Sequence, residues 1–312
     1  MKHKILVTCP PMLGMMDAFH PLFEERGAQA HCPQVVQTLS VPELVELVPQ
    51  FDGWIIGDDP ATAEVFEAGK RGSLKAAVKW GIGVDNVDFA ACERLGIPIT
   101  NTPDMFGAEV ADVALGYVIG LARDTYLIDR EVRAGHWPKP RGISLKGKRA
   151  GVIGHGDIGR NAITRLQAVG MDVIAWDPAF TGRADTLAPV HAWPEQIETC
   201  DFLVFTCALT PSSRHMLNAE SLARAKPGVR VVNVARGPLI DEPALIDALR
   251  SGHVDSAALD VMEQEPLPEA SPLRDFPRCI FGAHNGSNTS DAVAATSKIA
   301  LDKLIAFLRT DG

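Results

Sequence analysis

Short apolar runs, many of them β-branched, alternate with helical stretches along almost the whole chain, and no other feature restricts the fold as strongly. This order predicts parallel sheets, because parallel neighbours need a crossover connection between them. We therefore predict an α/β protein with two doubly wound parallel sheets. The expected strands are Lys4–Thr8, Ala28–Cys32, Gly53–Ile56, Leu74–Lys79 and Ile97–Thr100 in the first series, and Gly151–Gly154, Asp172–Asp177, Phe202–Thr206, Arg230–Ala235, Ser256–Asp260 and Cys279–Gly282 in the second.

Three segments join or close the two series. From 108 to 134 the chain has no proline and carries apolar residues at helical spacing, which predicts one long helix. Residues 135–148 are rich in Pro, Gly and Lys and predict an irregular arm. A last helix is expected over 289–308. At about 150 residues per domain, a length of 312 residues fits two domains.

Composition argues against several kinds of partner. Lys and Arg total 30 against 39 Asp and Glu, and an acidic chain without a basic run disfavours nucleic acid and anionic membranes. The six cysteines form no Cys-x-x-Cys pair, so neither a disulfide framework nor a metal site is expected. The first apolar run is too short for a signal peptide, and none reaches the ~18 residues that cross a bilayer. We therefore expect a cytoplasmic protein.

A glycine motif opens the second series. Residues 154–159 read Gly-His-Gly-Asp-Ile-Gly, directly after a predicted strand and before a helical stretch over 160–170. In this pattern, typical of Rossmann domains, Gly154 permits a tight turn, Gly156 lets a pyrophosphate approach, and Gly159 allows close helix–strand packing. Asp177 ends the next strand, where an acid binds the adenosine ribose. Because a carboxylate there repels a 2′-phosphate, NAD is the predicted cofactor rather than NADP.

Three polar residues follow later strands of the same series. They are Arg236, Glu265 and His284. Since ligands of open parallel sheets bind at the carboxyl ends of strands, these side chains are expected to meet in one site. An Arg can bind a substrate carboxylate in bidentate fashion, and an imidazole held by a carboxylate can exchange the hydroxyl proton near neutral pH. The set therefore predicts hydride transfer at a 2-hydroxy acid.

Taken in order, these motifs resemble the D-isomer-specific 2-hydroxyacid dehydrogenase family, and within it most closely the D-3-phosphoglycerate dehydrogenases. The likeness covers about residues 50–290. The segments that carry it are Gly81–Asp88, Asn101–Pro103, Ala108–Ala114, Gly154–Gly159, Asn233–Asp241, Ala258–Val261 with Glu265–Pro266, and His284.

The resemblance implies a set of site residues. It places Arg236 on the substrate carboxylate, His284 as acid/base and Glu265 as its partner, and Asp260 at the nicotinamide carboxamide. The residues expected to bind the cofactor are Gly154, Gly156, Asp157, Ile158, Gly159, Asp177, Thr206, Cys207, Val234, Ala235 and Asp260. Those expected to bind substrate are Lys79, Trp80, Gly81, Ile82, Gly83 and Arg236, with Gly81 and Gly83 offering backbone N–H groups.

The resemblance also implies a domain plan. A flavodoxin-like substrate domain would comprise residues 1–101 and 286–312, and a Rossmann NAD-binding domain residues 102–285. A homodimer through the cofactor domain is expected, with the arm near Trp137 crossing to the second copy. Because the sequence stops at Gly312, we expect neither the C-terminal regulatory domain of longer phosphoglycerate dehydrogenases nor serine feedback through it.

The sequence is compatible with more than one class of substrate. Lys79-Trp80 stands where phosphoglycerate dehydrogenases usually carry Arg-Ala; Lys79 can meet a phosphate or carboxylate, and Trp80 either narrows the pocket or packs in the core. A hydroxypyruvate/glyoxylate-type reductase or another pathway-specific 2-hydroxyacid dehydrogenase is the alternative. Formate dehydrogenase is disfavoured, because that relative has Gln where Glu265 stands. An NAD-sensing binding protein is disfavoured by the intact set of catalytic residues.

Overall fold

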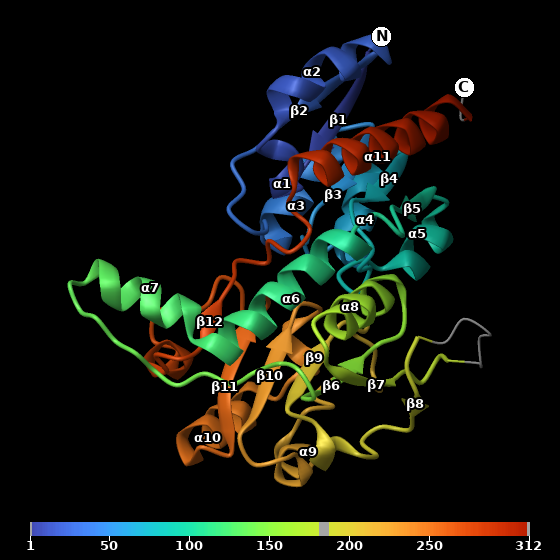
Figure 1. Ribbon diagram of the computed structural model, residues 1–312. Coiled ribbons are helices and arrows are strands. Elements are labelled where there is room, and N and C mark those ends of the chain that lie inside the picture. The colour runs from blue at the N-terminus through green and yellow to red at the C-terminus, as the bar shows by residue number, and fades with distance from the viewer. Residues whose placement is uncertain (1, 181–186, 311–312) are drawn as a thin grey trace. The chain divides into compact units, whose positions relative to one another are not determined.

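The computed structural model describes residues 2–180 and 187–310. The chain divides into two compact units, one formed by Met1–Met105 with Asn288–Gly312 and the other by Phe106–Ser287 (Figure 1). Each unit is built around one sheet in which every pair of neighbouring strands is parallel. The predicted α/β class with two parallel sheets is therefore confirmed.

The elements follow each other in strand–helix order. The strands are β1 (His3–Val7), β2 (Ala28–His31), β3 (Gly53–Ile56), β4 (Ala76–Lys79), β5 (Ile99–Asn101), β6 (Arg149–Ile153), β7 (Asp172–Trp176), β8 (Val190–His191), β9 (Phe202–Phe205), β10 (Val229–Asn233), β11 (Val254–Leu259) and β12 (Ile280–Phe281). The helices are α1 (Pro10–Leu13), α2 (Met16–Glu25), α3 (Val41–Leu47), α4 (Ala63–Arg71), α5 (Phe89–Leu95), α6 (Gly107–Arg123), α7 (Thr125–Arg133), α8 (Asp157–Ala168), α9 (Ala219–Arg224), α10 (Glu242–Ser251) and α11 (Ser290–Thr310). Short 3-10 turns cover Val48–Gln50, Ile197–Thr199, Gly237–Leu239 and Pro272–Asp275.

The sheet of the first unit has the order β2-β1-β3-β4-β5, which is the flavodoxin-like order. Strands β3 and β4 are buried along their whole length, as expected for strands covered by helices on both faces. Trp54 and Phe66 belong to the core between the sheet and α3, α4 and α5. Helix α11 packs on β3 and β4, where Leu304 leaves no room for a side chain at Gly53.

The sheet of the second unit has the order β12-β11-β10-β9-β6-β7-β8. Its central strands follow the Rossmann pattern, in which the direction of winding reverses between β6 and β9. Helices α6 and α8 pack against each other and against the sheet, and α9 and α10 contribute to the apolar core that includes Trp176 and Phe205. The carboxyl ends of β6 and β9 are therefore the expected ligand site of this unit.

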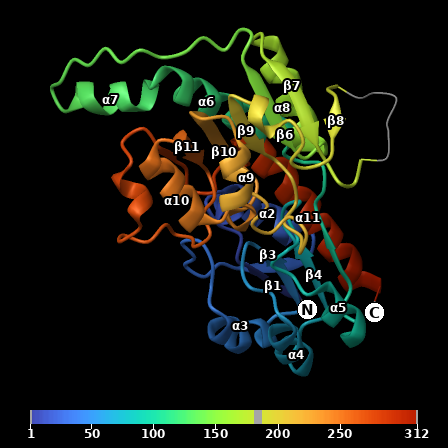
Figure 2. The same cartoon turned by 90° about the horizontal axis from the view of Figure 1, so that it is seen from below.

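The prediction of one helix over 108–134 is wrong. The stretch forms two helices, α6 and α7, which are separated at Asp124 in the left-handed conformation, with φ 53°. The buried carboxylate of Asp124 pairs with Arg278 at 2.9 Å, and this distant contact fixes the break. Figures 1 and 2 show α7 and the irregular segment after it projecting from the sheet of the second unit. Strand β8, at the edge of that sheet, is an element the sequence analysis did not predict.

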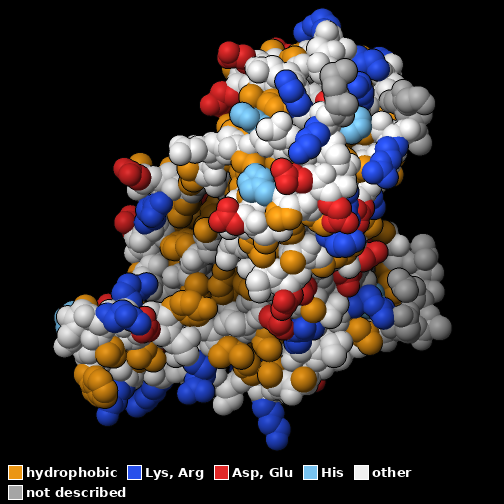
Figure 3. All heavy atoms as spheres, turned by 90° about the horizontal axis from the view of Figure 1, so that it is seen from above, with side chains coloured by type: hydrophobic (Ala, Val, Ile, Leu, Met, Phe, Trp, Pro, Cys, Tyr) orange, Lys and Arg blue, Asp and Glu red, His pale blue; other side chains and the backbone are white. Residues whose placement is uncertain are grey.

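Charged side chains of both signs are interspersed on the face of the molecule drawn in Figure 3. All six cysteines are free thiols, and four of them are buried, as expected for small apolar residues. In the parts of the chain that the structure describes, no helix combines the length and the apolar character that a membrane crossing needs.

Candidate active site

The carboxyl ends of three neighbouring strands carry the predicted acid/base and carboxylate-binding residues. Strand β11 pairs with β10 on one side and β12 on the other. Arg236 lies three residues beyond β10, Asp260 directly follows β11, and His284 lies three residues beyond β12. Figure 1 shows these three strands side by side, and because they are parallel, these residues follow the same end of the sheet.

His284 and Glu265 are hydrogen-bonded, as the sequence predicts. The distance from His284 Nδ1 to Glu265 Oε2 is 2.9 Å, and both side chains are about one-fifth exposed. The other oxygen of Glu265 accepts a hydrogen bond from the backbone N–H of Met262 at 3.0 Å, which orients the carboxylate. A carboxylate that accepts from Nδ1 keeps the proton of a neutral imidazole on that nitrogen, so that proton exchange falls to Nε2.

Asp260 fixes the turn that presents His284. The His284 N–H donates to the carbonyl of Asp260 at 2.7 Å, and the Gly286 N–H donates to the Asp260 carboxylate at 2.9 Å. These bonds hold His284 at φ 52°, in the left-handed region that non-glycine residues seldom adopt. The carboxylate also accepts from the hydroxyl of Tyr117 on α6 at 3.1 Å, and burial together with that negative charge raises the pKa of Tyr117.

Arg236 is half-buried and held by its own turn. One guanidinium nitrogen donates to the carbonyl of Ala235 at 2.8 Å. The buried side chain of Asn233 closes the turn, accepting from the Ala235 N–H at 3.0 Å and donating to the Arg236 carbonyl at 2.9 Å. Val234 and Ala235 are buried. Asn233 is therefore a positioning residue, and the sequence analysis did not single it out as a site residue although it lies within a predicted strand.

The glycine motif has the geometry that phosphate binding requires. Gly154 has φ +108°, and a Cβ there would lie 2.8 Å from the Cys207 nitrogen. A side chain at Gly159 would overlap the Gly154 carbonyl. Gly156 has open space around its Cβ position and caps α8 at its N-terminus. The exposed backbone of Gly156 and the free N–H groups of the first turn can therefore receive a pyrophosphate.

Asp177 is connected to this glycine loop. Its two oxygens accept hydrogen bonds from the backbone N–H groups of His155, at 2.7 Å, and Ala179, at 2.8 Å. The carboxylate therefore lies beside the loop at the end of β7, where it can also accept from a ribose hydroxyl. The structure supports the fit of a dinucleotide through these features of the loop, α8 and Asp177.

The neighbouring strand end supplies Thr206 and Cys207. The Thr206 hydroxyl donates to the carbonyl of Ile153 at 2.9 Å, which ties β9 to β6 just before the glycine turn. Burial raises the pKa of Cys207 to about 12, so this residue is a neutral thiol near neutral pH. In the first turn of α8, Ile158 is half-buried and the Asp157 carboxylate lies against Gly107 of α6. Over residues 2–180 and 187–310, no group of three or more His, Cys, Asp or Glu is arranged to hold a metal ion.

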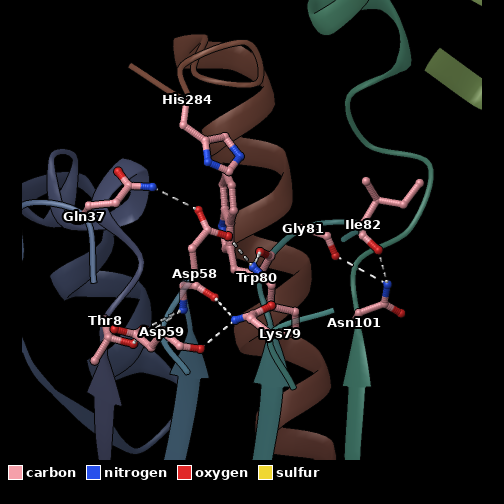
Figure 4. Close-up of polar contacts among 12 residues, drawn as sticks. Thr8, Gln37, Asp58, Asp59, Lys79, Trp80, Gly81, Ile82, Asn101 and His284 are labelled. Atoms are coloured by element: carbon pink, nitrogen blue, oxygen red, sulfur yellow. Dashed lines mark hydrogen bonds and ion pairs between the residues drawn. The ribbon is translucent and has the colours of Figure 1, made fainter. Parts of the chain in front are cut away.

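Apart from Arg236, the predicted substrate-binding residues lie in the first unit, where Lys79 and Trp80 are buried (Figure 4). The Lys79 ammonium group donates to Asp58 and to the carbonyl of Trp80, each at 3.0 Å. The Trp80 indole N–H donates to Ser297 of α11 at 3.0 Å, so the ring is held within its own unit. The sequence analysis missed Asp58, although it lies just after a predicted strand.

The loop after Lys79-Trp80 is held by hydrogen bonds to residues at the end of β5. Gly81 has φ +116°, and its N–H donates to the Thr102 hydroxyl at 2.7 Å. The side chain of Asn101 donates to the carbonyls of Gly81 and Ile82 at 3.4 and 3.3 Å. In this geometry the Gly81 N–H is used inside the protein, contrary to the expectation that it faces substrate. Ile82 is exposed and Gly83 is partly exposed, so this part of the loop is open to a ligand.

Comparisons with known proteins agree with this geometry. Residues 115–286 match the model of the D-isomer specific 2-hydroxyacid dehydrogenase NAD binding domain. The chain is 34% identical to a D-3-phosphoglycerate dehydrogenase from Methanocaldococcus jannaschii over 98% of its own length and 57% of that protein's. It is 36% identical to a hydroxypyruvate reductase from Thermotoga maritima over 81% of this chain and 84% of the relative.

Solved structures give the same result. The TT0316 protein from Thermus thermophilus superposes with a TM-score of 0.87 and 30% identity, over 98% of this chain and 97% of that one. The chain spans about half the length of several curated phosphoglycerate dehydrogenases that it matches, for example 48% of the human protein. The family model covers more than half of the 312 residues. The chain therefore belongs to the D-isomer specific 2-hydroxyacid dehydrogenases.

Proposed function

We propose that the protein is an NAD-dependent oxidoreductase that transfers a hydride between nicotinamide and a small D-2-hydroxy acid or its 2-oxo acid. The observation that carries this proposal is the Glu265–His284 hydrogen bond of 2.9 Å at an edge of the sheet whose glycine turn suits a dinucleotide. The family's NAD binding domain supports the choice of cofactor. Asp177 supports a preference for NAD over NADP, because its charge repels a 2′-phosphate.

NAD supplies the hydride acceptor or donor, and the protein binds, orients and exchanges the proton. In the oxidative direction His284 Nε2 takes the hydroxyl proton as the hydride leaves carbon 2, and Glu265 stabilises the resulting imidazolium. Arg236 binds the substrate carboxylate and so orients the carbon that reacts. In the reductive direction His284 returns the proton to the oxygen of the 2-oxo acid.

The cofactor set is proposed as a whole from the ends of β6, β7, β9, β10 and β11. It comprises Gly154, Gly156, Asp157, Ile158, Gly159, Asp177, Thr206, Cys207, Val234, Ala235 and Asp260. From the first unit, Ile82 and Gly83 are proposed to meet substrate through their backbone N–H groups, with Gly81 providing the turn. Lys79 and Trp80 are proposed to hold the start of that loop in place, because both are buried and form hydrogen bonds within the first unit.

Two substrate classes suit this assignment. Relatives named D-3-phosphoglycerate dehydrogenase support a phosphoglycerate dehydrogenase-like activity. The hydroxypyruvate reductase relative supports the alternative, a reductase of hydroxypyruvate or glyoxylate type.

We assign the substrate domain to residues 1–101 and 286–312, and the cofactor domain to residues 102–285. We further propose a homodimer through the cofactor domain. Helix α7 has no buried residue, and Tyr126 and Val132 on it, with Trp137 after it, expose apolar surface that a second copy would cover. Free thiols at all six cysteines support a reducing compartment such as the cytoplasm.

Turnover of D-2-hydroxy acids and 2-oxo acids, measured with NAD(H) and NADP(H), tests the proposal. His284→Asn should lower kcat about 10²–10⁴-fold, because the general acid/base is lost, while NADH still binds in a fluorescence titration. His215→Asn is the matched control, since His215 is hydrogen-bonded to Glu263 rather than to Glu265. Undiminished turnover by His284→Asn would refute the assignment. NADH binding by the wild type without turnover of any acid in the panel would favour an NAD-sensing protein instead.

A further inference from the structure

His155 is a large side chain placed between the first two glycines of the motif at 154–159. It lies two residues beyond β6 and is only 4% exposed. The roles of the three glycines, a tight turn, access for a pyrophosphate and close helix packing, do not depend on which side chain stands here. The burial of an imidazole at this position therefore points to a role of its own within the second unit.

The ring of His155 contacts the ring of Phe180. The two ring centroids lie 5.2 Å apart and the ring planes are inclined by 68°, which is the edge-to-face arrangement that aromatic pairs favour. Phe180 lies four residues beyond β7, the strand next to β6 in the sheet (Figure 1). The contact therefore joins the glycine turn after β6 to the segment that follows β7.

The same two segments supply the hydrogen bonds that orient Asp177. One carboxylate oxygen accepts from the His155 N–H at 2.7 Å, and the other accepts from the Ala179 N–H at 2.8 Å. The Phe180 N–H donates to the Asp177 carbonyl at 3.1 Å and closes the turn. Each carboxylate oxygen keeps a second lone pair for a ribose hydroxyl. The direction in which Asp177 presents these lone pairs thus depends on how the two segments are held together.

We propose that His155 is a positioning residue for cofactor specificity: by packing on Phe180 it holds the two N–H donors around Asp177 and so keeps the carboxylate directed at the adenosine ribose. A carboxylate fixed in this way accepts from a ribose hydroxyl of NAD and repels a 2′-phosphate. A carboxylate that can turn away does both less well, because a binding group needs neighbouring contacts that lock its orientation. This inference rests on the proposed function and adds a residue that acts through Asp177.

Equilibrium binding of NADH and NADPH tests this role without turnover. The Kd of each is measured by fluorescence titration for the wild type and for His155→Ala, which removes the ring and keeps the backbone N–H. The Kd for NADH should rise about 3- to 10-fold, the range that one aromatic pair supports. The Kd for NADPH should stay the same or fall, because repulsion of the 2′-phosphate weakens. The ratio of the Kd for NADPH to that for NADH should therefore fall at least about threefold.

Two further variants test whether the ring contact is the cause. His155→Phe retains a ring against Phe180 and should keep the ratio within about twofold of the wild-type value. Phe180→Ala should lower the ratio as His155→Ala does, and the double variant should lower it no further, because both changes remove the same contact. Phe180 is half-buried, so Phe180→Ala carries the test if His155→Ala does not fold.

His253→Ala is the matched control. It removes the same side chain just before β11, at the opposite end of the sheet, where His253 Nε2 lies 3.1 Å from the Ala225 carbonyl oxygen. It should leave the ratio of the two Kd values unaltered. A urea unfolding curve for each protein measures its stability separately.

The outcomes separate this inference from the proposed function. A wild-type ratio in His155→Ala, even with a lower free energy of unfolding, would overturn the positioning role and leave the proposed function in place. A ratio that falls as far in His155→Phe as in His155→Ala would also overturn it, because the ring contact would not be the cause. Absence of NADH and NADPH binding by the folded wild type would refute the proposed function itself.

Discussion

Glutamine at position 265 would keep the hydrogen bond from the Met262 N–H but reverse the one to His284. The wild-type carboxylate accepts from Nδ1 at 2.9 Å and from the Met262 N–H at 3.0 Å. In Glu265→Gln the amide oxygen stays with Met262, so the NH₂ group faces Nδ1 and donates to it. The neutral ring then carries its proton on Nε2 and cannot accept the hydroxyl proton there.

The size of the effect follows from the bond that is lost. A hydrogen bond to a charged group contributes about 1.5–3 kcal/mol, and the Glu265 carboxylate makes this bond to the imidazolium formed in the oxidative direction. At about 1.4 kcal/mol per factor of ten, kcat for oxidation should fall about 10- to 150-fold. The Kd for NADH should change less than threefold, because Glu265 is not among the residues assigned to the cofactor.

Steady-state oxidation at saturating NAD, measured from pH 6 to pH 9, is the assay. Glu263→Gln is the control, since it makes the same change in charge two positions away, at a residue bonded to His215 at 2.5 Å. The pH profile of kcat should change in Glu265→Gln and stay that of the wild type in Glu263→Gln. A loss in kcat below threefold, or an equal loss in both variants, would refute the argument that Glu265 orients and charges the imidazole.

The remaining predictions concern Arg236, which is proposed to bind the substrate carboxylate, and the glycine turn with Asp177. Arg236→Lys should raise KM for the 2-hydroxy acid at least about tenfold, because an ammonium group cannot make the bidentate bond; an unchanged KM would place the carboxylate elsewhere. Asp177→Asn keeps an oxygen for the His155 N–H and should relax the preference against NADP, whereas an unaltered ratio of Kd values for NADH and NADPH would contradict the ribose contact. Gly159→Ala places a methyl group against the Gly154 carbonyl and should lower the free energy of unfolding by about 1–3 kcal/mol, which a urea titration measures; equal stability would show that the turn can adapt.

The sequence predicts those features whose signal is local. The glycine turn, the parallel strands and the position of Arg236 at a strand end each depend on a few consecutive residues, and the structure contains all three. The helix break at Asp124 could not be predicted, because its cause is Arg278, a partner 154 positions away in sequence. The β8 strand was missed because two residues are too few to show a period.

The same distinction holds for the charges of the candidate site. Nothing near Lys79 in the sequence indicates that its ammonium group forms an ion pair with Asp58, 21 positions earlier. A paired lysine and an unpaired one therefore cannot be distinguished from the sequence. The strain at His284 is also invisible there, since it results from bonds to Asp260 that form only in the folded sheet. Sequence patterns therefore located the proposed acid/base residue, and the structure shows how its side chain is held.

Asp260 has two roles. It is proposed to bind the cofactor, and it also forms hydrogen bonds within the protein that need no ligand. Its buried carboxylate accepts from the Tyr117 hydroxyl and from the Gly286 N–H, and both donors would lose a partner without it. A descendant of this protein that no longer used a nicotinamide would still be under selection to keep an acid at this position. Position 260 would thus remain an aspartate even after the loss of activity, because this side chain connects helix α6 to the turn that carries His284.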